Sequence, residues 1–149
     1  MENYKAEIFC GDGYCSLELA SKLCDAGFIV DCPFLWAFND DESYIVSSMS
    51  AIDVPFVNNS LLNGSPDDVF YVAAPTLSVA NDWVREMYNM YVSTEPYVTN
   101  EGIKYLFKLW TVDKENLSFQ KIKESTGYEN PYDAIENGLM FVFNKILKM

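Results

Sequence analysis

The sequence predicts an α+β fold in which three helices pack on antiparallel sheet. Apolar residues recur at helical spacing in three segments, 16–26, 77–88 and 131–146. Short runs rich in aromatic and β-branched residues, which favour strands, lie between these segments. Turn residues separate the runs at short intervals, as in an antiparallel meander. The expected order is therefore helix, strands, helix, three-stranded meander and helix.

The first helix is expected over residues 16–26. Ser16 can cap it, because a serine hydroxyl accepts a hydrogen bond from a free backbone N–H of the first turn. Its apolar stripe consists of Leu17, Ala20, Leu23 and Cys24. Gly27 follows and can adopt the left-handed conformation that ends a helix.

Short apolar runs then predict strands at residues 29–30, 34–38 and 44–46. Residues 39–42 read as the turn of a hairpin between the last two strands. Residues 47–68 are polar and rich in turn residues, so most of this segment is expected to form a long surface loop. A further strand is expected at residues 69–72.

The second helix begins after Thr76, a good N-cap that follows Pro75. Its polar face carries Asp82, Arg85 and Glu86. Its apolar stripe, which places Trp83 in the core, is formed by Leu77, Ala80, Trp83, Val84, Met87 and Tyr88.

The meander strands are expected at residues 91–98, 103–112 and 117–122. Pro96 indicates that the first strand lies at an edge or ends early, since proline lacks the N–H that a central strand needs. Side chains of the second strand alternate between two faces. One face holds Ile103, Tyr105, Phe107 and Leu109. The other face holds Lys104, Leu106, Lys108 and Trp110.

The last helix is expected to start with Asn130 as its cap and Pro131 as its first residue. Its buried face consists of Ala134, Ile135, Leu139, Val142 and Ile146. No internal repeat or linker interrupts the sequence. A single α+β domain over residues 1–149 is therefore expected.

The composition excludes several classes of function. The chain of 149 residues contains no histidine, which rules out mechanisms that need imidazole as a base or metal ligand. Ten Lys and Arg against 22 Asp and Glu give a net charge of −12. Residues 1–75 carry two basic and twelve acidic side chains, whereas residues 76–149 carry eight and ten. This acidity argues against direct binding of nucleic acid, which needs clustered Lys and Arg.

The acidic first half has three interpretations. It is a solvated surface that keeps the chain soluble, a face for a protein partner, or a carboxylate site for Mg²⁺ or Ca²⁺. A suitable partner would be a basic protein, for instance one that binds nucleic acid. The local clusters consist of Asp40, Asp41, Glu42, Asp67 and Asp68. The first three lack the alternating ligand spacing of an EF-hand.

Four cysteines lie in the first quarter of the chain: Cys10, Cys15, Cys24 and Cys32. Their spacing does not match the paired C-x2-C of structural zinc sites, so free thiols are expected, with zinc or a redox role as alternatives. No cofactor is expected. The sequence shows no secretory signal and no apolar run long enough to cross a membrane. A cytoplasmic location without membrane contact is therefore expected.

No motif selects catalytic residues, so a protein without catalytic activity is favoured over an enzyme. The glycine-rich turn at residues 11–13 lacks the third glycine of a dinucleotide site and the lysine of a P-loop. Trp110 shares a strand face with Lys104 and Lys108 and is the best candidate for an exposed aromatic contact. The alternative for Trp110 is ordinary packing.

Several segments resemble a loose group of small uncharacterised proteins of gut bacteria and their phages or mobile elements. Residues 74–86 resemble an APTLxxAxxWLRE stretch, and residues 132–139 resemble a YExAxExGL stretch. Residues 15–20 and 26–28 match the opening of the same group. The resemblance implies a phage or mobile-element origin, but no known activity and no catalytic residues. The long segment 47–68 and the acidic first half depart from the shorter members.

The sequence thus predicts a small acidic accessory protein that acts by protein–protein contact. Its contact surface is expected to draw on Asp40, Asp41, Glu42, Asp67, Asp68 and Trp110. One alternative is a small-molecule or nucleotide-binding protein, including an enzyme that uses carboxylates and a divalent metal. Another is a virion or assembly component. Exposed strand edges in the meander also make a homodimer an expectation.

Overall fold

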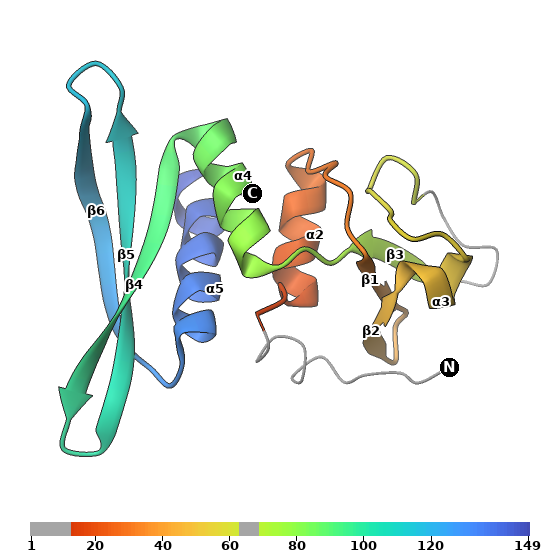
Figure 1. Ribbon diagram of the computed structural model, residues 1–149, viewed down its shortest axis with the longest axis horizontal. Helices are drawn as coiled ribbons and strands as arrows, with labels where there is room; N and C mark the ends of the chain where they lie inside the picture. Colours follow the sequence, from red (N-terminus) through yellow and green to blue (C-terminus); the bar gives the residue numbers. More distant parts are fainter. Residues whose placement is uncertain (1–12, 63–68) are drawn as a thin grey trace. The chain divides into compact units, whose positions relative to one another are not determined.

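The computed structural model describes residues 13–62 and 69–149, and the chain divides into two compact units, Met1–Thr76 and Leu77–Met149 (Figure 1). Each unit combines helices with a three-stranded antiparallel sheet, which confirms the α+β class. The described ranges contain four α-helices rather than the three expected. The single domain over residues 1–149 stays a prediction.

The first unit has a small sheet with the strand order β2-β1-β3, in which both pairs are antiparallel. The expected helix, hairpin and later strand are confirmed. Ser16 forms the expected cap, because its Oγ accepts a hydrogen bond from the Leu19 N–H at 3.1 Å. The elements, in chain order, are α2 (Leu17–Asp25), β1 (Phe34–Phe38), β2 (Ser43–Ser47), α3 (Ser48–Ile52) and β3 (Phe70–Ala73).

The central strand β1 is buried on both faces. Leu35 and Ala37 belong to a core cluster that includes Val57. Trp36 points to the other face, because side chains alternate along a strand. Its indole N–H donates a hydrogen bond to the Cys15 carbonyl at 3.0 Å. This bond ties the sheet to the segment that leads into α2.

Two expectations for this unit are wrong. Residues 29–30 form no strand, and both side chains are exposed. The segment 47–68 was expected to be a loop, yet it contains α3. The Ser47 hydroxyl accepts a hydrogen bond from the Ser50 N–H at 3.1 Å and so caps this short helix. The same segment also forms an antiparallel bridge between Cys32 and Val57.

The second unit contains the meander, with the strand order β4-β5-β6. The last strand runs to Tyr128 rather than ending at residue 122. Asn130 caps the last helix as expected, since its Oδ1 accepts a hydrogen bond from the Asp133 N–H at 2.9 Å. The elements are α4 (Leu77–Tyr88), β4 (Met90–Thr99), β5 (Gly102–Asp113), β6 (Ser118–Tyr128), α5 (Pro131–Phe141) and the π-helical turn η1 (Val142–Ile146).

One face of this sheet packs against α5, which lies beside β4, to the right of the sheet, in Figure 1. Phe107 and Leu109 of β5 are buried on this face, as the alternation of the strand predicts. On α4, Met87 was expected in the apolar stripe but is exposed. Trp83 is half-buried, with its ring 5.9 Å from that of Tyr88, rather than fully in the core.

The outer edge of β4 is covered by a side chain of α4. The buried Asn81 donates a hydrogen bond from Nδ2 to the Val92 carbonyl at 2.8 Å and accepts one from the Val92 N–H at 3.1 Å. Both backbone groups of Val92 that face away from β5 are therefore satisfied. A strand from another chain cannot pair with β4 at this point without displacing Asn81.

Candidate interaction surface

The face of the second sheet opposite α5 carries the candidate site, and we call it the open face. Lys104, Lys108 and Trp110 of β5 lie on it, while the alternate residues of β5 point toward α5. Each of these three side chains is partly exposed. Trp110, Lys104 and Lys108 were predicted to share one face of the strand, and the pairing of β5 with β6 agrees with this prediction.

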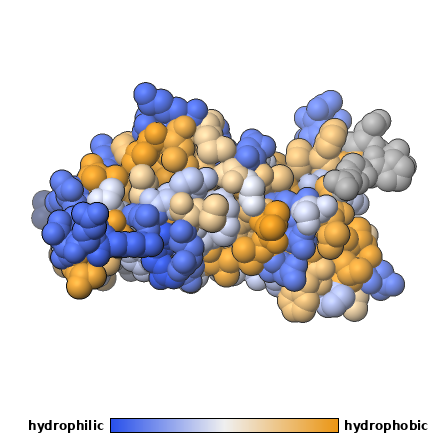
Figure 2. All heavy atoms as spheres, turned by 90° about the horizontal axis from the view of Figure 1, so that it is seen from above, coloured by the Kyte–Doolittle hydropathy of each residue, from blue (hydrophilic) through white to orange (hydrophobic). Residues whose placement is uncertain are grey.

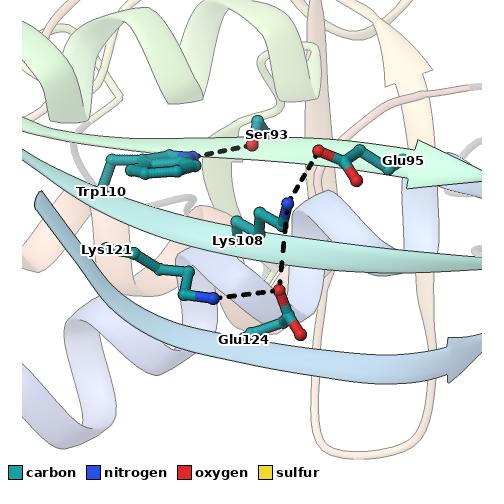
Figure 3. Close-up of polar contacts among 6 residues, drawn as sticks. All are labelled: Ser93, Glu95, Lys108, Trp110, Lys121 and Glu124. Atoms are coloured by element: carbon teal, nitrogen blue, oxygen red, sulfur yellow. Dashed lines mark hydrogen bonds and ion pairs between the residues drawn. The ribbon is translucent and has the colours of Figure 1, made fainter. Parts of the chain in front are cut away.

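Three aromatic side chains from three adjacent strands meet at one end of the open face. Trp110 pairs with Tyr91 of β4, and its ring lies 6.2 Å from that of Phe119 on β6, at 73°. The indole N–H donates a hydrogen bond to Ser93 Oγ at 2.8 Å, which fixes the orientation of the ring (Figure 3). The three aromatic residues and Ser93 line a hollow of about 260 Å³, which we call the aromatic cleft. Its lining residues are Tyr91, Ser93, Trp110 and Phe119.

The cleft is mostly apolar because aromatic rings line it, and the Ser93 hydroxyl is already bonded to Trp110. Phe119 is 63% exposed although it lies beside two other aromatic rings. Apolar residues reach the surface of the molecule in separate patches among hydrophilic ones (Figure 2). An exposed cluster of three aromatic rings is the kind of patch that marks interaction sites.

A second hollow of about 290 Å³ adjoins the aromatic cleft, because Tyr91 and Phe119 line both. Its far end carries Arg85, Glu86 and Lys114. Arg85 already contacts Glu86 at 3.1 Å. The groove therefore changes from apolar at the Trp110 end to charged at the Lys114 end.

The middle of the open face is occupied by ion pairs between strands (Figure 3). Lys108 Nζ lies 2.9 Å from Glu95 Oε1 and 4.0 Å from Glu124 Oε1, and Lys121 reaches the same Glu124 oxygen at 3.3 Å. The hydrogen bond to Glu95 raises the pKa of Lys108 above its ordinary value. These lysines are neutralised by their own sheet, so they give the open face little net positive field.

Three of the five predicted acidic residues lie in the hairpin turn between β1 and β2. Asp40, Asp41 and Glu42 are all exposed. Asn39 organises the turn, because its Oδ1 accepts hydrogen bonds from the Asp41 and Glu42 N–H groups, each at 2.9 Å. The other two predicted acids, at positions 67 and 68, lie outside the described residues.

The cysteines show no shared chemistry in the part of the chain that the structure describes. Cys15, Cys24 and Cys32 form no disulfide with one another, while Cys10 lies outside the described residues. Burial, and to a lesser degree Asp31, raises the pKa of the Cys32 thiol to about 11, which makes it a poor nucleophile. Residues 13–62 and 69–149 contain no group of three or more His, Cys, Asp or Glu placed to hold a metal ion.

Of the residues that line the aromatic cleft, only Trp110 is predicted from the sequence, whereas Tyr91, Ser93 and Phe119 are not. Pairing Tyr91 with Trp110 requires the register of β4 against β5. Phe119 lies beside Trp110 because the pairing of β5 with β6 shifts by one residue between Leu109 and Trp110. A β-bulge of this kind re-aims side chains and leaves little trace in a hydrophobic pattern.

Among the described residues, no helix is both long enough and apolar enough to cross a membrane. Comparison of the chain with protein-family models, curated proteins and solved structures finds no match to any of them, so the geometry of the cleft stands by itself as the basis for a function.

Proposed function

We infer that this protein acts by binding another protein, and that the aromatic cleft on the open face is the contact. The observation that supports this most is the exposure of Phe119 beside Trp110 and Tyr91. Tryptophan and tyrosine are enriched among the residues that contribute most to protein–protein binding, because they bury a large rigid area. The cleft offers such an area to an apolar side chain of the partner.

The charges of the second unit favour a protein over a nucleic acid. Residues 77–149 carry eight basic and ten acidic side chains. On the open face Lys104, Lys108 and Lys121 are each paired with a glutamate. Phosphate binding needs unpaired cations, whereas an apolar anchor needs none.

The edges of the sheet favour an extended partner segment that lies along β6. Asn81 covers β4 at Val92. Within the described ranges no strand pairs with the outer edge of β6, and nearly all of its residues are exposed. A strand added to β6 places every second side chain on the open face, next to Phe119. A large apolar side chain at that position can reach the aromatic cleft.

A comparison of retained proteins tests this function. Wild type, Phe119→Ala and the control Val98→Ala are immobilised and exposed to lysate of the source organism. Val98 is 84% exposed on β4 but lies outside the cleft. We expect a protein that wild type and Val98→Ala retain equally and that Phe119→Ala retains about fivefold less, the size of a loss near 1 kcal/mol. Equal retention by all three forms would contradict a contact at the cleft.

The basic partner for the acidic first half remains a proposal, supported by the exposure of Asp40, Asp41 and Glu42. Raising the salt concentration in the same experiment separates the two contacts, because exposed charges are screened at high salt and apolar contacts are not. A partner that is lost with salt and is insensitive to Phe119→Ala would assign binding to the acidic turn. The phage or mobile-element origin, the virion role and the homodimer stay predictions.

A further inference from the structure

A second groove lies on the other side of the sheet, between α5 and the edge strand β6. It has a volume of about 270 Å³. Its polar rim consists of Lys123, Ser125, Tyr128, Asn137, Asn144 and Lys145. Its apolar floor consists of Phe107, Met140 and Phe141. None of the residues that line it is acidic.

Beside this groove, α5 packs close to β4 and β5. A Cβ atom on Gly138 would lie 2.6 Å from Val92 Cγ1 and 3.2 Å from Phe107 Cδ1, so only glycine allows this approach. The helix is thereby held over these two strands, and it contacts β6 less extensively. The helix flank toward β6 consists of residues spaced at i, i+3, i+4 and i+7: Asn137, Met140, Phe141 and Asn144.

Two polar residues on this flank belong to a π-helical turn. The turn η1 continues α5, and the Leu147 N–H donates to the Val142 carbonyl at 2.8 Å, five residues back. Asn144 and Lys145 lie within it and line the groove. π-helical turns are rare and often occur at functional sites.

The lysines of this groove differ from those of the open face. Lys123 Nζ lies 5.4 Å from the centre of the Phe141 ring, which holds it at the groove. Neither Lys123 nor Lys145 forms an ion pair with any described residue, whereas Lys108 and Lys121 on the open face share Glu124. In a chain with a net charge of −12, a groove with two such lysines and no acid is unusual.

Neighbouring contacts fix the uncharged donors at the rim. Asn137 Nδ2 donates to the Asp133 carbonyl at 2.8 Å, which orients its amide. The Ser125 and Tyr128 hydroxyls lie 3.1 Å apart. The Tyr128 ring packs 5.8 Å from that of Phe107 and continues the aromatic floor. A ligand here meets cations and hydrogen-bond donors at the rim and flat apolar surface below.

We propose that this groove binds a small organic anion in which a carboxylate or phosphate group is joined to a flat apolar body. The anionic group lies between Lys123 and Lys145, and the apolar body lies on Phe141 and Phe107. Polar groups that converge beside apolar side chains fix the orientation of a ligand in small-molecule sites. This site is independent of the aromatic cleft, since the two share no lining residue.

Titration of the full chain followed by ¹H–¹⁵N NMR tests the site. The probes are phenyl phosphate, benzoate and the cation benzylamine. We expect one or both anions to shift the amide signals of β6, α5 and η1, and benzylamine to leave them in place. Lys123→Gln and Lys145→Gln should each weaken anion binding by about threefold or more, as loss of one partly screened charge does. The spectrum of each variant also shows whether it is folded.

Lys114→Gln is the matched control. Lys114 lines the hollow that adjoins the aromatic cleft and does not line the groove between α5 and β6. Unchanged affinity in this variant, together with weaker binding in the other two, supports the proposal. A loss of affinity with Lys114→Gln instead would place the anion at the open face and overturn it. Equal binding of benzylamine, or no shift with either anion, would also overturn it. None of these outcomes depends on whether a protein binds the aromatic cleft.

Discussion

The Cys32 thiol shows how burial sets the reactivity of a single residue. Its side chain is 2% exposed, and burial followed by the charge of Asp31 raises its pKa to about 11 from an ordinary value of 9.0. We therefore expect iodoacetamide to modify Cys32 much more slowly in the folded protein at pH 8 than in urea, because the thiolate is the reactive form. Peptide mapping by mass spectrometry measures this. Equal rates in both conditions would show that the thiol is accessible.

The Cys32 thiol is also expected to lower the free energy of unfolding as the pH rises above 9.0. Well below pH 9.0 the thiol is mostly protonated in both the folded and the unfolded chain, so it hardly changes the free energy of unfolding. Between pH 9.0 and about 11 the unfolded chain releases the proton while the folded chain keeps it. We expect Cys32→Ala to remove part of the loss of stability that wild type shows across this window. Parallel stability curves for the two proteins would contradict the assignment.

Ser48 is a buried residue whose hydroxyl lowers stability. Its Oγ has no hydrogen-bond partner among the described residues, and the residue is 0% exposed. Burial of an unsatisfied hydroxyl is unfavourable, so Ser48→Ala should raise the free energy of unfolding by about 1 kcal/mol. Urea denaturation measures this, with Ser78→Ala, at an exposed position of α4, as the control. A lower stability of Ser48→Ala would mean that the hydroxyl has a stabilising partner.

At the scale of elements, the packing of α5 depends on Gly138. An alanine there places its Cβ 2.6 Å from Val92 Cγ1, within a core that has no room for it. We expect Gly138→Ala to lower the free energy of unfolding by about 1–3 kcal/mol, the usual cost of overpacking. Asn137→Ala, one residue earlier and exposed, is the control. Equal stability of wild type and Gly138→Ala would show that α5 can shift away from the sheet.

Elements with strong local signals could be predicted from the sequence. Residues 131–141 combine the Asn130 cap, Pro131 and a clear apolar stripe, and α5 begins where these signals place it. The helix α3 was missed because its five residues are too short to show a period, and only the Ser47 cap marks it. The extension of β6 to Tyr128 was missed because its edge position leaves nearly every side chain exposed, which removes the alternating pattern.

At the scale of the whole molecule, the charge is divided between the two compact units. The first unit carries a net −10 and the second a net −2. The second unit has its own sheet, helices and buried core, including Val92, Leu109 and Leu139. We expect a fragment of residues 77–149 to unfold cooperatively in urea and to give a dispersed NMR spectrum. A spectrum of an unfolded chain would show that the two units fold only together, as one domain.

The candidate site could be predicted only in part, because it depends on contacts between distant residues. Trp110 was found from the alternation of one strand, which is a local property. Its contact with Phe119 depends on a register shift, and the close approach of α5 to the sheet depends on Gly138. Neither the register shift nor the close approach at Gly138 can be recognised from the composition or the spacing of residues in the sequence.

Site-specific photocrosslinking shows whether a partner protein contacts the aromatic cleft. The photoreactive residue p-benzoylphenylalanine replaces Phe119 in one protein and Val98 in another, and both are irradiated in cells of the source organism. We predict an adduct of one defined mass from position 119 and none of that mass from position 98, because only position 119 lies at the cleft. Excess wild-type protein should suppress this adduct, and excess Phe119→Ala should not. The same adducts from both positions, or none from position 119, would contradict this contact.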